Sequence, residues 1–65
     1  MKYRGYYSLT LVTPDGEVAK TEQTAEFEVD EFEHPGGRLR RIALNEMLRQ
    51  SAMGVCINEF SEVNV

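Results

Sequence analysis

The fold is decided by residues 7–16, which read Tyr-Ser-Leu-Thr-Leu-Val-Thr-Pro-Asp-Gly. The apolar residues at odd positions alternate with Ser8 and Thr10, a period of two that is typical of a strand with one buried face. Pro14 fixes φ at the second position of a turn, and Gly16 supplies the left-handed position of a three-residue hairpin loop. The stretch therefore predicts a β-hairpin.

The alternation continues in the return strand, where Ala25, Phe27 and Val29 are separated and followed by acidic residues. The hairpin is therefore predicted over about residues 3–30. Residues 21–24 are polar on both faces, which predicts a bulge or a break at that point of the return strand.

A loop over residues 31–37 and a helix over about residues 38–53 follow the hairpin. Pro35 disfavours helix before it, and the two glycines after it disfavour any regular element. Good helix formers then run without interruption, and Gly54 is a natural C-terminal stop. Leu39 and Met47 lie on one face of this helix at helical spacing.

A last strand is predicted over about residues 55–65, with an irregularity near Asn58, where the apolar alternation changes parity. The order β-β-α-β predicts one small α+β domain over residues 1–65, with a mostly antiparallel sheet and one helix packed on one face. Leu44 and Leu48 lie on a stripe well to one side of the main apolar helix face. They either pack into the crook of a twisted sheet or contact a second subunit or target.

Composition excludes several classes of protein. The chain has 65 residues, is 42% hydrophobic and carries a net charge of -4, which is too apolar and too weakly charged for a disordered chain. A chain this short hides only about 60% of its surface on folding, so we expect self-association or a partner protein to complete the core. The single Cys56 excludes an intramolecular disulfide.

Targeting signals and cofactor sites are not evident. Apolar runs fall well short of the ~20 residues of a membrane span, and residues 1–5 lack the apolar core of a signal peptide. We therefore expect a cytoplasmic protein without a membrane partner. His34 and Cys56 are too few ligands for a structural zinc site, so we expect neither metal nor cofactor.

The sequence gives little support for an enzyme. Cys56 and His34 form a formal nucleophilic pair, but a cysteine between Val55 and Ile57 on a strand is more typical of a small core residue. The glycine pair after Pro35 lacks the spacing of a phosphate-binding loop. We predict no catalytic residues.

Charge is distributed unevenly along the chain. Seven of the eleven acidic residues fall between Glu17 and Glu33, and four of the seven basic residues lie on the predicted helix. Glu26, Glu28 and Asp30 are expected along one strand face about 6.5–7 Å apart, close to the ~7 Å scale of successive phosphates on a nucleic-acid strand. Such a row is either a decoy for a DNA-binding enzyme or an ordinary solvated sheet face.

Three arginines crowd the start of the predicted helix, where the macrodipole disfavours cations. They are Arg38, Arg40 and Arg41. This placement calls for compensation, either by salt bridges to the acidic segment of the same or a neighbouring chain, or by an anionic partner.

Two stretches resemble a known family. Residues 7–12, followed by Asp15-Gly16 in the turn, are similar to the first hairpin of the small uracil-DNA glycosylase inhibitors encoded by Bacillus phages. About sixteen residues past the turn that family carries Ser-Asp-Phe-Glu, and residues 30–33 here read Asp-Glu-Phe-Glu. Gly37 and the charged helix after it also have counterparts. The tyrosine that the family places shortly after the Glu is replaced here by residues 34–36.

The resemblance implies a homodimeric, non-enzymatic inhibitor that occupies the DNA-binding groove of its target by mimicking DNA and has no direct contact with nucleic acid. Phe32 would then be an apolar contact and Glu33 a phosphate surrogate. The partner-binding residues expected on this basis and from the charge pattern are Glu26, Glu28, Asp30, Glu31, Phe32 and Glu33. Leu44 and Leu48 are candidate apolar contacts with a second subunit or partner.

Two other functions remain open. A small acidic β-β-α-β chain is also similar in outline to the phage protein that inhibits bacterial RNA polymerase by lodging in its DNA channel, an analogy of fold order alone. In a structural or adaptor module, Leu44 and Leu48 would bind a partner and the acidic residues would only keep the protein soluble.

Overall fold

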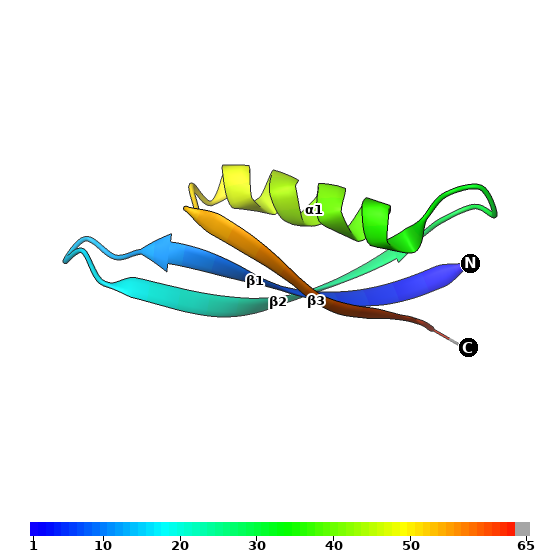
Figure 1. The fold of residues 1–65 in the computed structure, drawn as a ribbon, viewed down its shortest axis with the longest axis horizontal. Coiled ribbons are helices and arrows are strands. Elements are labelled where there is room, and N and C mark those ends of the chain that lie inside the picture. The colour runs from blue at the N-terminus through cyan, green and yellow to red at the C-terminus, as the bar shows by residue number, and fades with distance from the viewer. Residues whose placement is uncertain (64–65) are drawn as a thin grey trace.

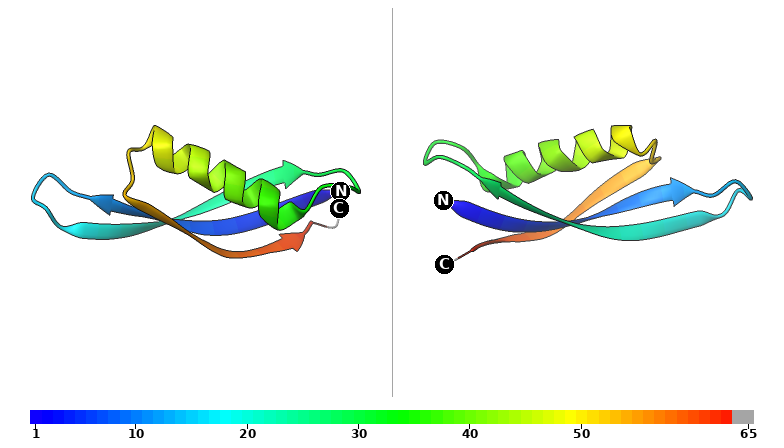
Figure 2. Two further views of the ribbon diagram at one scale, coloured as in Figure 1. Left: turned by 45° about the horizontal axis from the view of Figure 1, so that its top comes forward. Right: turned by 180° about the vertical axis from the view of Figure 1, so that it is seen from behind.

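A computed structural model describes residues 1–63 of the chain. The elements in chain order are β1 (Lys2–Val12), β2 (Val18–Glu28), α1 (Pro35–Arg49) and β3 (Gly54–Glu62). Within residues 1–63 the strands form an antiparallel sheet in the order β2-β1-β3, and α1 covers one face of it (Figure 1, Figure 2). The predicted α+β class is confirmed.

The β1–β2 hairpin is a regular ladder from Lys2 opposite Glu28 to Val12 opposite Val18. The bulge or break predicted at residues 21–24 is therefore wrong. Thr21 and Gln23 face the helix side but are only half-buried, so their polar side chains keep access to water and the pairing continues.

The hairpin turn forms as predicted. The Thr13 backbone N–H donates to the Glu17 carbonyl at 2.8 Å, and the Gly16 N–H donates to the Thr13 carbonyl at 2.9 Å. Gly16 has a φ of +83°, the left-handed conformation that favours glycine.

The irregularity predicted near Asn58 is confirmed. Tyr6 pairs with Glu59 but Tyr7 pairs with Ile57, so Asn58 is an extra residue in β3, which makes a β-bulge. The predicted strand over 55–65 is observed from Gly54 to Glu62, and residues 64–65 lie outside the described residues.

The core lies between α1 and the face of the sheet that carries the odd-numbered residues of β1. Leu9 and Leu39 are fully buried, and Tyr7, Phe27, Val29 and Ala43 join them. Gly5 of β1 lies directly beneath Leu39, so the helix approaches the strand backbone closely at this point. The opposite face, called the open face below, carries the even-numbered residues of β1 and β2.

The helix begins earlier than predicted, at Pro35 rather than near Arg38. Proline at the first helical position is favoured because its missing N–H needs no partner there. His34 is the N-cap, and its Nδ1 accepts a hydrogen bond from the Gly36 N–H at 3.1 Å. The cap and the proline together outweigh the helix-breaking tendency of the two glycines.

The helix also ends earlier than predicted, at Arg49 rather than near Met53. The Ala52 N–H donates to the Met47 carbonyl at 2.9 Å, and the Ser51 N–H donates to the Leu48 carbonyl at 3.2 Å. These two bonds form a Schellman cap, in which Ser51 adopts the left-handed φ of 54° that usually selects glycine. Gly54, the predicted stop, begins β3 instead.

The Ser51→Gly variant is expected to unfold at a higher urea concentration than the wild type. Glycine removes the left-handed strain of a residue with a Cβ, and we expect a net gain of about 0.5–1 kcal/mol after the entropy of the unfolded chain is counted. Ser51→Ala is the control, because it removes the hydroxyl but keeps the strain. An equal gain in both variants would contradict the conformational explanation.

An acid-sensitive contact closes the end of α1. The side chains of Arg49 and Gln50 both donate hydrogen bonds to the Glu46 carboxylate. These bonds, the one from Arg49 most of all, lower the pKa of Glu46 from its ordinary value of 4.5 to about 2. A carboxylate with a lowered pKa stabilises the folded state above its ordinary pKa and loses that contribution as the pH falls through the folded value.

We therefore expect the free energy of unfolding to fall between about pH 4.5 and pH 2, and to fall less steeply in Glu46→Gln. Thermal melts followed by circular dichroism over this range would show the difference between the two slopes. Parallel slopes would mean that the Glu46 contact has no net effect on folding.

Candidate protein-binding site

The connection between β2 and α1 forms a hydrogen-bonded turn that carries an exposed phenylalanine. The Phe32 N–H donates to Asp30 Oδ1 at 2.9 Å, and the Glu33 N–H donates to the Asp30 carbonyl at 3.3 Å. Asp30 thus caps the turn in the way that Asp commonly does. The Phe32 side chain is 91% exposed. The segment between β2 and α1 that carries it lies at the end of the molecule where the N-terminus also lies (Figure 1).

An ion pair holds this turn against the helix. Arg38 Nε and one terminal nitrogen donate to the two carboxylate oxygens of Glu33 at 2.6 and 2.7 Å, and a second nitrogen donates to the Glu28 carbonyl at 3.3 Å. The bidentate geometry is the strong form of an arginine–carboxylate contact. Arg38 is therefore compensated within its own chain, one of the possibilities that the arginine cluster raised.

The acidic row predicted on β2 is only partly formed. Glu26 and Glu28 lie exposed on the open face, but β2 ends at Glu28, so Asp30 belongs to the turn and not to the row. Lys2 and Arg4 of β1 both pair with Glu26, and the hydrogen bond from Arg4 is the largest cause of its lowered pKa. The expected row of three outward carboxylates is wrong because the chain turns to enter the helix.

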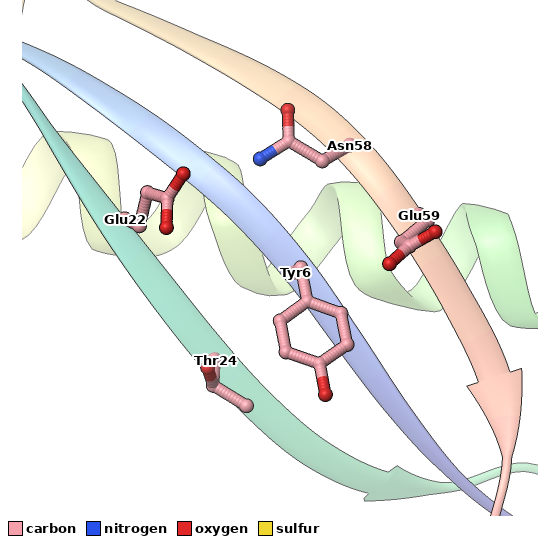
Figure 3. Close-up of a pocket in the computed structure, with 5 residues that line it drawn as sticks. All are labelled: Tyr6, Glu22, Thr24, Asn58 and Glu59. Atoms are coloured by element: carbon pink, nitrogen blue, oxygen red, sulfur yellow. The ribbon is translucent and has the colours of Figure 1, made fainter.

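A shallow hollow lies on the open face, with α1 on the far side of the sheet (Figure 3). Its volume is about 430 Å³, and it is lined by Tyr6, Glu22, Thr24, Asn58 and Glu59. The side chain of Asn58, the bulged residue, donates to Ser8 Oγ at 3.0 Å. The hollow offers carboxylates and hydroxyls to a hydrogen-bond donor or a cation.

The sequence did not predict this hollow. Glu22 and Glu59 are 37 positions apart in the chain and line the same hollow from opposite sides of Tyr6, because β1 lies between β2 and β3. The alternation of each strand indicates that these side chains are outward, but the strand order is needed to bring them together.

The two candidate apolar residues of the helix, Leu44 and Leu48, are exposed. Contact with a second subunit or a target requires this exposure, whereas packing against the sheet would have buried them. Leu48 is 72% exposed and Leu44 is 36% exposed. Leu48 lies in the last turn of α1, while the Phe32 turn precedes its first turn, so the two apolar features lie at opposite ends of the helix. They are two separate surfaces.

Cys56 and His34 are not brought together. Cys56 is exposed on the open face opposite Ser8, so its expected burial as a core residue is wrong. His34 caps the helix and its ring packs edge-on against Phe60, with ring centroids 6.3 Å apart. Val55 and Ile57 pair with Leu9 and Tyr7 on the helix-covered face, so the alternation of the strand places Cys56, which lies between them, on the open face.

Residues 1–63 contain no cluster of three His, Cys, Asp or Glu side chains that is arranged to hold a metal ion. Over the same part of the chain, no helix has the length and apolar character needed to cross a membrane.

Comparison with protein-family models, with curated proteins and with solved structures finds no match for this chain. A function for this protein is therefore inferred from the contacts of the turn at residues 30–33 and from the sequence resemblance of residues 7–12 and 30–33.

Proposed function

We propose that the protein is a non-enzymatic inhibitor that binds a host DNA-processing enzyme through the turn of residues 30–33. The observation that carries this proposal is Phe32, which is 91% exposed although hydrogen bonds and an ion pair fix the turn around it. Aromatic residues are enriched at protein interfaces, and an ordered turn holds this side chain ready to insert into a partner with little loss of entropy.

The charges around Phe32 favour a basic partner. Asp30 and Glu31 are exposed and form no salt bridge within residues 1–63. Carboxylates at the rim of an apolar contact raise the association rate with a positively charged groove. Enzymes that bind DNA carry such grooves because they neutralise phosphates.

The resemblance of the turn to the phage inhibitor family makes uracil-DNA glycosylase the first target to test. Phe32 then supplies the apolar contact, and Asp30 and Glu31 supply the negative charge. Glu33, expected as a phosphate surrogate, is already bonded to Arg38, so its role here is to hold the turn. Because a target of this kind lies in the bacterial cytoplasm, we propose that the protein acts there. Inhibition by this contact requires no cofactor.

A titration of uracil excision tests the proposal. A bacterial uracil-DNA glycosylase is assayed on a uracil-containing oligonucleotide with increasing amounts of the protein, at low and at physiological salt. We expect activity to fall at a near-stoichiometric ratio, with slower association at higher salt. Unchanged activity, with no complex on a sizing column, would refute this target. Transcription by bacterial RNA polymerase is the parallel assay for the analogous inhibitor.

The exposed end of α1 supports a second candidate function, an adaptor module. Leu48 is 72% exposed and Leu44 lies one turn before it, a spacing that suits an apolar groove on a partner. An adaptor would lose its partner in Leu48→Asp and keep it in Phe32→Ala. The inhibitor proposal requires the reverse.

A further inference from the structure

The outer edge of β2 is a long, regular strand edge that has no pairing partner among residues 1–63. β2 pairs with β1 on one side only, because the strand order within residues 1–63 is β2-β1-β3. It runs for 11 residues without a bulge or a proline. An unbroken edge of this length is a template for pairing with another strand. The edge of β3 differs, because the bulge at Asn58 interrupts it.

The hairpin register determines which backbone groups point outward from this edge. The Val29 N–H donates to the Met1 carbonyl, and the Met1 amino group donates to the Val29 carbonyl. In an antiparallel ladder such bonds recur at every second residue, so odd-numbered residues of β2 bond to β1. The N–H and C=O groups of Lys20, Glu22, Thr24 and Glu26 therefore face outward.

The C-terminal end of this edge is covered. Arg38 donates to the Glu28 carbonyl at 3.3 Å, which blunts the edge after Glu26. The segment available for pairing is therefore Lys20–Glu26, which is centred on Gln23. The helix packs mainly against β3 and makes its fewest contacts with β2, so it does not obstruct this edge.

The charges on this segment are self-complementary in one register. With a two-fold axis at Gln23, Lys20 of one copy lies opposite Glu26 of the other, twice by symmetry, and Glu22 lies opposite Thr24. If the two strands slip by two residues in one direction, Glu22 of one copy lies opposite Glu22 of the other. If they slip by two residues in the other direction, Glu22 of each copy lies opposite Glu26 of the other. Like charges directly opposite destabilise a strand pair, so both slips are disfavoured.

We propose that two copies of this chain pair antiparallel through the β2 edge, about a two-fold axis at Gln23, to form a continuous six-stranded sheet. The four outward residue pairs each exchange two backbone hydrogen bonds, and the Lys20–Glu26 pairs fix the register. This interface is distinct from Leu44 and Leu48, and it requires no target enzyme.

Reversed charges give the decisive experiment. The mass of each folded protein is measured by sedimentation equilibrium over about 1–500 µM at low salt, the range in which small interfaces associate. We expect a dimer for the wild type. Lys20→Glu and Glu26→Lys each place like charges opposite one another twice, so each alone should dissociate at least about tenfold more readily. An equimolar mixture of the two variants should form a heterodimer, because both pairs are then opposite in sign.

Thr24→Pro tests the backbone contribution. The Thr24 N–H faces outward, so proline there removes no bond to β1 but blocks the second copy. We expect a monomer with the circular dichroism spectrum of the wild type. Leu48→Asp is the matched control and should remain a dimer.

A wild type that stays monomeric across the range would overturn the proposal. So would a dimer that survives Lys20→Glu and Thr24→Pro unchanged, or one that Leu48→Asp dissociates. If Glu26→Lys fails to fold because it loses its contacts with Lys2 and Arg4, the other two β2 variants still decide the outcome.

Discussion

Gly5→Ala is expected to lower the free energy of unfolding by about 2–3 kcal/mol, a large part of the ~3–10 kcal/mol available to a domain of this size. A Cβ at position 5 would lie 2.5 and 2.6 Å from the two Cδ atoms of Leu39. Leu39 is fully buried, so it has no room to rotate away. The helix must lift or the strand must bend, and either movement opens the core.

Gly54→Ala is the matched control in urea denaturation. It introduces the same methyl group on a strand of the same sheet, but the nearest atom is Thr10 Cβ at 3.8 Å, an ordinary contact. We expect a change of less than about 0.5 kcal/mol or a slight gain.

A double variant tests the cause of the Gly5 effect. Leu39→Ala alone should cost about 2–5 kcal/mol because it leaves a cavity in the core. Gly5→Ala in that background places its methyl group in the space that Leu39 has vacated, so the double variant should be at least as stable as Leu39→Ala. Costs that simply add would show that the contact with Leu39 is not the source of the loss.

Phe32→Ala is expected to weaken inhibition of the target enzyme by about 100-fold, with little change in stability. Burial of a phenylalanine side chain at a protein interface contributes about 1.5–3 kcal/mol, and central apolar contacts often contribute more on truncation. The side chain is 91% exposed in the free protein, so its loss removes almost no core packing. Uracil excision and a thermal melt, measured side by side, separate the two effects.

Three further variants sharpen this result. Leu48→Ala also truncates an exposed apolar residue and should inhibit like the wild type. Glu31→Gln should slow association at low salt, whereas Glu17→Gln, an acidic residue at the hairpin turn, should not. Equal inhibition by Phe32→Ala and the wild type would show that the turn is not the contact surface.

Local sequence signals predicted most of the fold. The alternation in residues 7–12, the Pro14–Gly16 turn and the parity change near Asn58 each act over a few residues, and the structure has all three. The helix begins and ends at other residues than predicted, because capping interactions decide both ends. The His34 cap and Pro35 start the helix in spite of the two glycines that follow, and the hydrogen bonds of residues 51 and 52 end it before Gly54.

The candidate site was predicted less completely. The sequence placed Phe32 among carboxylates, but which carboxylates remain unpaired depends on contacts between distant segments. Glu26 meets Lys2 and Arg4 through the hairpin register, and Glu33 meets Arg38 through the geometry of the turn. The distribution of acidic residues along the sequence therefore predicted a more negative surface on β2 than the structure has.

By itself, then, the sequence determined the hairpin, the class of the fold and the acidic segment around Phe32, because periodicity and turn chemistry are local. Only the tertiary structure decided which acidic residues are neutralised, that Glu22 and Glu59 line one hollow, and that the β2 edge is open. These properties follow from the strand order β2-β1-β3 and from the packing of α1 mainly against β3. Contacts between segments far apart in the chain determine the strand order and the helix position, and no local sequence pattern predicts such contacts.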